Sequence, residues 1–208
     1  VDPRPYGLDG GLTLWSKDLN HDGDLKDTDE FARLYAGMRR GGRNYYALDV
    51  TNVNSPQLMW QITGGSGDFV DLGQTWSEPV KSKIYMKESP SADAAAYDVL
   101  IFAGGYDGDQ DNATVRTADD IGNAIYIVNA ETGALLWSGG NHNGHDKNFS
   151  AMDYSIPSDV RVLDMNRDGL ADQLYVGDMG GQVWRFDISQ EGETANSLVQ
   201  GGVIANLA

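Results

Sequence analysis

Residues 174–187, LYVGDMGGQVWRFD, have the pattern of a β-hairpin, and this pattern recurs along the chain. An apolar run, Leu174–Gly177, ends in glycine and is followed by a turn with two more glycines. The second run, Val183–Asp187, is rich in aromatic and β-branched residues. Such residues favour strands, and glycine permits the tight turn between them. We therefore predict two antiparallel strands here.

The same pattern occurs twice earlier in the chain. Leu34–Gly37 leads to Tyr45–Asp49, and Ile101–Gly104 leads to Ile125–Asn129. In both copies a polar turn and a further strand follow, Leu58–Trp60 and Leu135–Trp137. The copies recur about every 70 residues, as expected for a repeat architecture.

Four antiparallel strands per repeat are typical of a β-propeller blade. We predict an all-β chain in which residues 1–208 are part of one propeller domain, with repeats at approximately 8–62, 75–140 and 153–190. A propeller needs about 4–8 blades, so three repeats indicate a fragment of a larger ring. Four tryptophans are expected in the core, Trp60, Trp76, Trp137 and Trp184.

Helices are expected to be few. Short helical turns are predicted within Thr28–Met38 and Ala92–Ala96, and a loop is predicted over Gln190–Asn196.

Composition narrows the function. The net charge of −16 argues against nucleic acid and anionic lipid as partners and favours cations. The absence of cysteine excludes disulfides, zinc–thiolate sites and cysteine nucleophiles. No stretch is long and apolar enough to span a membrane directly, and no signal peptide opens the chain.

The first candidate metal site is DLNHDGDLKDTD at residues 18–29. Oxygen-bearing side chains stand at loop positions 1, 3, 5 and 12, and glycine stands at position 6. Calcium takes six to eight oxygen ligands, and a glycine allows the sharp bend of the loop. The alternative interpretation is a solvated acidic turn without a metal ion. The candidate calcium ligands are Asp18, Asn20, Asp22, Asp24 and Asp29.

The second candidate is DMNRDGLAD at residues 164–172. Positions 1, 3, 5 and 9 carry oxygens, and position 7 can offer its backbone carbonyl. Without a cation, three carboxylates on one tight turn would repel one another. The candidate calcium ligands are Asp164, Asn166, Asp168, Leu170 and Asp172.

Both loops occupy the same place in their repeats, between the first and second strands. The middle repeat has KESPSAD at residues 87–93 there, without a ligand pattern. Asp107–Asp111 is a weaker third candidate, for which an exposed loop is the better interpretation. His142 and His145 are expected in a solvent-exposed turn, and Arg39–Arg40 at the surface or against a partner.

Three segments resemble the PilY/PilC-type factors of bacterial type IV pili. They are RRGGRNYYALDV at 39–50, GQTWSEP at 73–79 and YVGDMGGQVWRFD at 175–187. The resemblance extends from about Tyr6 to Ile188. It implies blades of the quinoprotein type, and it implies that Asp164, Asn166, Asp168 and Asp172 match the calcium loop of that family. The first loop matches only a subset of the family.

The same resemblance implies an exported protein at the cell surface or pilus tip, passing through the periplasm or outer membrane. Its partners would be pilus subunits such as minor pilins, and a host-cell or abiotic surface. Its role would be pilus assembly, extension and adhesion, without enzymatic activity. Two alternatives remain open, a dehydrogenase with a pyrroloquinoline quinone cofactor and a generic secreted scaffold stapled by calcium. The absence of cysteine argues against the first alternative.

Overall fold

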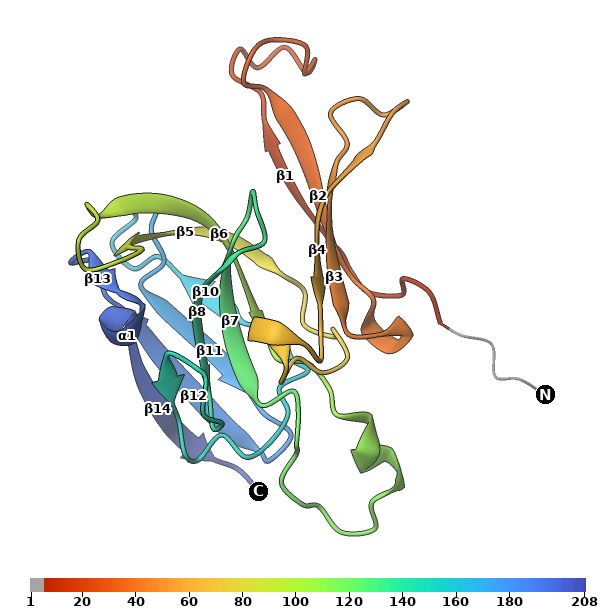
Figure 1. The fold of residues 1–208 in the computed structure, drawn as a ribbon, viewed down its shortest axis with the longest axis vertical. Helices are drawn as coiled ribbons and strands as arrows, with labels where there is room; N and C mark the ends of the chain where they lie inside the picture. The colour runs from red at the N-terminus through yellow and green to blue at the C-terminus, as the bar shows by residue number, and fades with distance from the viewer. Residues whose placement is uncertain (1–5) are drawn as a thin grey trace.

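The computed structural model describes residues 6–208, which fold into three β-sheets (Figure 1). Apart from the two-residue strand β13, the strands of one sheet precede those of the next along the chain. The first sheet has the order β1-β2-β3-β4, the second β13-β5-β6-β7-β8-β9 and the third β10-β11-β12-β14. The first sheet contains β1 (Leu12–Lys17), β2 (Phe31–Gly37), β3 (Asn44–Asp49) and β4 (Gln57–Thr63). The second sheet contains β5 (Val80–Lys87), β6 (Ala95–Ala103), β7 (Ala124–Asn129), β8 (Leu135–Gly140), β9 (Lys147–Asn148) and β13 (Glu193–Thr194). The third sheet contains β10 (Arg161–Leu163), β11 (Gln173–Gly177), β12 (Gln182–Ile188) and β14 (Val199–Asn206).

Each sheet contains four antiparallel strands, and we call these four-stranded units blades 1, 2 and 3. In the middle sheet the two-residue strands β13 and β9 pair in parallel with the edges of blade 2. Blade 3 extends beyond the predicted end of its repeat at residue 190, because β14 supplies its fourth strand. The loop predicted over 190–196 instead contains β13 and the start of a short helix, α1 (Ala195–Leu198). Pairing with β12 makes a strand of the glycine-containing β14, so tertiary context overrides weak local propensity.

The helical turns predicted within Thr28–Met38 and Ala92–Ala96 are wrong. Phe31–Gly37 is a strand because it pairs with β1 on one side and β3 on the other. Ser89–Ala92 closes a backbone turn, and β6 begins at Ala95. Three short 3-10 helices lie outside both segments, at Arg39–Gly41, Gly67–Phe69 and Gly108–Asn112.

Blades 1 and 2 are joined by an aromatic core. Tyr35 and Trp60 stack with ring centroids 5.8 Å apart. The Tyr35 hydroxyl and the Trp60 indole N–H both donate to the carbonyl of Ala130 in blade 2, at 3.0 and 3.1 Å. Because their polar ends find this acceptor, both large rings can be buried between the blades.

A second core lies between blades 2 and 3. Trp137 and Trp184 are fully buried in it, and the Trp184 ring stacks on Phe186 with centroids 5.9 Å apart. Phe149 packs edge-on against Trp184 and Phe186. Core positions are therefore confirmed for Trp60, Trp137 and Trp184.

The pairing register of the strands shows which faces of the three blades are equivalent to one another. Leu34 pairs with Leu48 in blade 1, Leu100 with Val128 in blade 2, and Leu174 with Phe186 in blade 3. The sequence comparison aligned Ile101 of the middle copy with Leu34 of the first copy. The strand pairing instead places Leu100 at the position of Leu34, one residue earlier.

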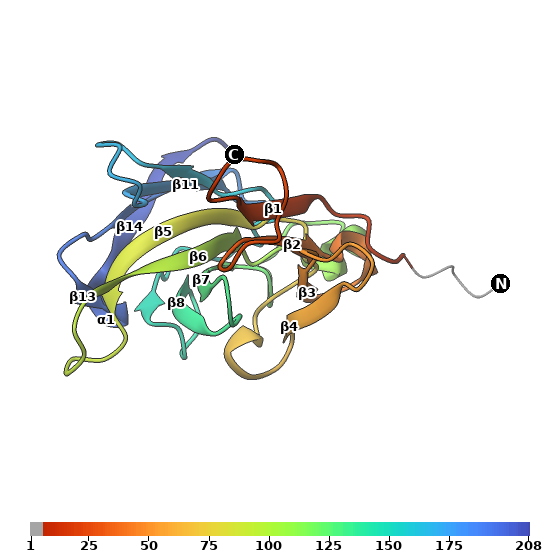
Figure 2. The ribbon, with the colours of Figure 1, turned by 90° about the horizontal axis from the view of Figure 1, so that it is seen from above.

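These rows are buried in blades 2 and 3 but not in blade 1. There the row continues to Leu14 and Leu58, which are 60% and 59% exposed. Figures 1 and 2 show blade 1 at one side of the molecule. The exposure of Leu14 and Leu58 shows that this face of its sheet is uncovered. None of the helices among residues 6–208 is long and apolar enough to cross a bilayer.

Candidate functional site

The two predicted metal loops occupy the same place in their blades. One joins β1 to β2 and the other joins β10 to β11, and each begins with the residue after the strand, Asp18 or Asp164. The sequence prediction of a shared position is confirmed.

The second loop is wound around the carboxylate of Asp164. Its Oδ1 accepts from the backbone N–H of Arg167 at 2.5 Å, and its Oδ2 accepts from that of Gly169 at 2.8 Å. The turn requires positive φ angles of 65° at Arg167 and 89° at Gly169. A left-handed backbone is favourable at glycine, which explains residue 169, and it is strained at arginine.

The other predicted ligands lie around the same loop. Asn166 Nδ2 donates to Asp168 Oδ2 at 2.9 Å, and the Leu170 N–H donates to Asp168 Oδ1 at 2.8 Å. Asp172 Oδ2 accepts from the N–H of Met165 at 2.6 Å, so the last carboxylate returns to the start of the loop.

The first loop repeats these contacts. Asp18 accepts from the backbone N–H groups of His21 and Gly23, at 2.7 and 3.0 Å. Asn20 Nδ2 donates to Asp22 at 3.1 Å. The φ angles of His21 and Gly23 are 60° and 80°, close to those of their counterparts in the second loop. The two loops therefore share one backbone conformation over residues 18–23 and 164–169, whereas the first loop is longer beyond that point.

Glu30 closes the first loop, a residue that sequence reasoning missed. Its Oε1 accepts from the N–H of Leu19 at 2.9 Å, as Asp172 does from Met165. Glu30 is buried, whereas Asp29 is exposed with a φ of 69°. The preference of EF-hand loops for glutamate as the last ligand was the available signal.

Asp24 lies at the loop position that Leu170 holds in the second loop, and its carboxylate pairs with Lys26. This leaves its backbone carbonyl as the group comparable with that of Leu170. Within residues 6–208, no cluster of three or more His, Cys, Asp or Glu side chains is arranged so that it could hold a metal ion. Calcium binding at the loops stays a prediction.

The third candidate loop differs from expectation at its first residue. Asp107 is buried, and its carboxylate accepts from the N–H groups of Asp109 and Asp120 at 3.0 and 3.2 Å. It caps the short helix Gly108–Asn112, whereas Asp109 and Asp111 are exposed as predicted.

The prediction of an exposed turn is wrong for His145. Its Nε2 lies 3.1 Å from Asp71 Oδ2 and its Nδ1 lies 3.0 Å from Ser138 Oγ, with the side chain only 5% exposed. Sequence reasoning missed this Asp–His–Ser chain because Asp71 comes from the distant linker between β4 and β5. Ser138 is buried, which denies a substrate access to its hydroxyl, and the chain ties the linker to blade 2. His142 is half-exposed and its Nδ1 lies 3.2 Å from Asp71 Oδ1.

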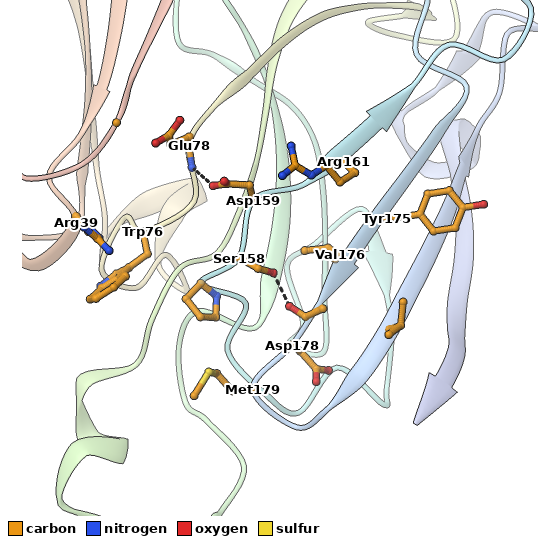
Figure 3. Close-up of a pocket in the computed structure, with 14 residues that line it drawn as sticks. Arg39, Trp76, Glu78, Ser158, Asp159, Arg161, Tyr175, Val176, Asp178 and Met179 are labelled. Carbon is orange, nitrogen blue, oxygen red and sulfur yellow. Dashed lines mark hydrogen bonds between the residues drawn. The ribbon is translucent and has the colours of Figure 1, made fainter. Parts of the chain in front are cut away.

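A cavity of about 880 Å³ opens where the three blades meet (Figure 3). The cavity is lined by the segment before β5 and the segment before β10. A hydrogen bond joins these two segments, because the Glu78 N–H donates to Asp159 Oδ1 at 2.8 Å. Trp76 is only half-buried and lines this cavity, so its predicted core position is wrong. The Arg39 guanidinium lies over its ring, 4.3 Å from the centroid.

The family described as the PilY1 beta-propeller domain matches residues 3–203. The chain belongs to this family. A PilY1 homologue of Xylella fastidiosa, described as a type IV pilus biogenesis factor, is 30% identical over 190 residues, which cover 88% of this chain. The type IV pilus biogenesis factor PilY1 of Pseudomonas aeruginosa strain UCBPP-PA14 is 29% identical over 155 residues, or 74% of the chain.

The PilY1 fold is also found in a solved structure. The C-terminal domain of Pseudomonas aeruginosa PilY1 superposes with a TM-score of 0.59 at 22% identity, covering 94% of this chain and 36% of that one. The resemblance drawn from the sequence and the propeller-type fold are both confirmed. The chain spans only 11% of the length of each of the two PilY1 relatives named above.

Proposed function

We propose that this chain is the calcium-binding propeller region of a type IV pilus biogenesis factor that supports pilus assembly, extension and surface adhesion. Its partners are pilus subunits, including minor pilins, and a host-cell or abiotic surface. The protein is exported and acts at the cell surface or pilus tip. The observation that carries the calcium proposal is the shared conformation of the loops that begin at Asp18 and Asp164.

Electrostatics supports a cation in the second loop. Asp164, Asp168 and Asp172 lie within nine residues, and no described Lys, Arg or His forms an ion pair with any of them. A cation within the loop would relieve the repulsion among these carboxylates. Calcium suits the mixture of carboxylate, amide and carbonyl oxygens, whereas magnesium demands a tighter, near-octahedral shell.

The position of the loop links calcium to pilus function. Asp172 connects the loop to the rest of blade 3, because its N–H donates to the carbonyl of Leu163 and its Oδ1 accepts from Gln190. Calcium there would fix the hairpin of β10 and β11 and the surface that this hairpin presents. The pilus role is inferred from the two PilY1 relatives, which are described as type IV pilus biogenesis factors.

The test is Asp172→Ala in the full-length protein in cells. We expect less surface piliation and twitching at an unchanged protein level. Asp93→Ala is the matched control, since Asp93 is an exposed acid in the corresponding connection of blade 2. Normal piliation in a variant that has demonstrably lost calcium at this loop would reduce the loop to a structural staple.

The proposal includes no catalytic role. After reconstitution with pyrroloquinoline quinone, we expect no oxidation of alcohols or sugars in a dye-coupled assay. Turnover above a protein-free control would favour the dehydrogenase alternative instead.

A further inference from the structure

Three buried oxygen atoms in one region have no hydrogen-bond partner. They are Asp119 Oδ1, Asn123 Oδ1 and Ser155 Oγ. Asp119 is 4% exposed, Asn123 1% and Ser155 0%. A buried polar atom without a partner is costly, so this cluster calls for a ligand of its own.

The three residues are joined in a single cluster. The backbone N–H of Ser155 donates to Asp119 Oδ2 at 2.5 Å, and Asn123 Nδ2 donates to the carbonyl of Asp119 at 3.0 Å. The Asp119 N–H donates to the carbonyl of Asp153 at 2.8 Å. The segment before β7 and the segment before β10 thus meet at the Asp119 carboxylate.

The surroundings of Asp119 are acidic. Asp107, a second buried carboxylate, accepts from the N–H of the neighbouring Asp120. No described Lys, Arg or His forms an ion pair with Asp119. A buried carboxylate without a compensating cation is unfavourable.

Asp119 also lines a cavity of about 240 Å³ at the surface beside the cluster. Arg116 lines the same cavity, but its Nη1 donates to the carbonyl of Met179 at 3.3 Å and its guanidinium lies over the Tyr154 ring. This arginine therefore does not neutralise Asp119 by an ion pair.

We propose that Asp119, Asn123 and Ser155 bind a calcium ion at a third site, separate from the two Asp/Asn loops. Carboxylate, amide and hydroxyl oxygens are the hard ligands that calcium accepts in irregular arrangements. A divalent ion offsets the negative charge of Asp119 better than a monovalent ion such as sodium does. It would also coordinate the three oxygen atoms that have no hydrogen-bond partner. The site joins blades 2 and 3 through the segments that carry Asp119 and Ser155.

The test begins with a chain in which both loops are disabled, Asp18→Ala and Asp164→Ala, stripped with a chelator. Calorimetry with calcium chloride should detect about one ion per chain. Adding Asp119→Asn should abolish that binding or weaken it at least tenfold, because the only carboxylate of the three ligands is lost. Adding Asp120→Asn, at the exposed neighbouring acid, should leave it unchanged.

Ser155→Ala provides a milder variant if Asp119→Asn does not fold, as judged by near-ultraviolet circular dichroism. It should weaken calcium binding while the chain remains folded. No calcium binding in the loop-disabled chain, or binding that neither variant weakens, overturns the proposal and leaves ordered water as the partner of these oxygens. Failure of the two loops to bind calcium would appear separately, as an unchanged stoichiometry when Asp18 and Asp164 are replaced.

Discussion

Gly169 shows how a single residue sets the conformation of the second loop. Its φ of 89° lies in the left-handed region, and a Cβ placed there would meet nothing within 4 Å. Gly169→Ala should therefore lower the free energy of unfolding through backbone strain alone, by about 1–2 kcal/mol. Gly202→Ala is the control, since its Cβ also meets nothing and its φ is not in that region. Equal denaturant midpoints for the two variants would contradict this account.

His145 is a second residue whose environment has a measurable effect. Burial lowers the pKa of its imidazole below the usual 6.5, although the Asp71 carboxylate opposes this shift; His142 and Asp146 have smaller effects. Because the folded protein favours the neutral ring, His145 contributes stability above pH 6.5, and this contribution is lost as the pH falls through the lowered pKa.

An NMR titration of the histidine ring protons measures this directly. We expect the buried His145 to titrate below 6.5, and His145→Gln should reduce the loss of thermal stability on acidification. His142→Gln, which removes the other histidine that contacts Asp71, is the comparison variant. A His145 pKa at or above 6.5 would mean that the Asp71 carboxylate dominates.

At the scale of the element, calcium should stabilise the β10–β11 hairpin. An ion that binds only the folded state contributes about 2.7 kcal/mol when its concentration is 100-fold above Kd. Calcium should raise the melting temperature of the parent chain and raise it less in Asp172→Ala, with Asp93→Ala behaving like the parent. Equal calcium-induced shifts in the parent and Asp172→Ala would show that Asp172 is not a ligand.

The elements themselves were largely predictable from sequence, and the exceptions have physical reasons. Aromatic and β-branched runs such as Val183–Asp187 specify strands locally. By contrast, β14 contains Gly201 and Gly202 and is a strand because β12 pairs with it. Trp76 looked like a core residue, but the meeting of three blades leaves its ring beside a cavity.

The two candidate calcium loops could be recognised from the sequence because all of their candidate ligands lie within 12 consecutive residues or fewer. The hydrogen bond from the Leu19 N–H to Glu30, which closes the first loop, was not predicted. The pairing register of β2 decides whether Asp29 or Glu30 faces Leu19, and the local sequence does not specify that register. The burial of His145 and the cluster at Asp119 arise from residues far apart in sequence, which no local pattern brings together.

At the scale of the whole molecule, the uncovered face of blade 1 is the main unpartnered surface. Leu12, Leu14 and Leu58 are each about 60% exposed there, whereas the outer face of blade 3 carries Arg161, Tyr175 and Arg185. Exposed apolar surface of this kind promotes association. The isolated chain should self-associate with increasing concentration in analytical ultracentrifugation.

Leu14→Lys combined with Leu58→Lys should reduce that association without lowering the melting temperature, because both side chains project from an exposed face. Val183→Lys, on the outer face of blade 3 that carries Tyr175 and Arg185, is the comparison variant and should change association little. A parent chain that stays monomeric at high concentration would contradict the assignment of this face as an association surface.

Anomalous diffraction from crystals grown with calcium would locate any calcium ions bound at the two loops. We expect an anomalous peak inside each loop. One should lie among Asp164, Asn166, Asp168, the Leu170 carbonyl and Asp172, and the other among the corresponding groups from Asp18 to Glu30. Well-ordered loops without an anomalous peak at saturating calcium would contradict this expectation.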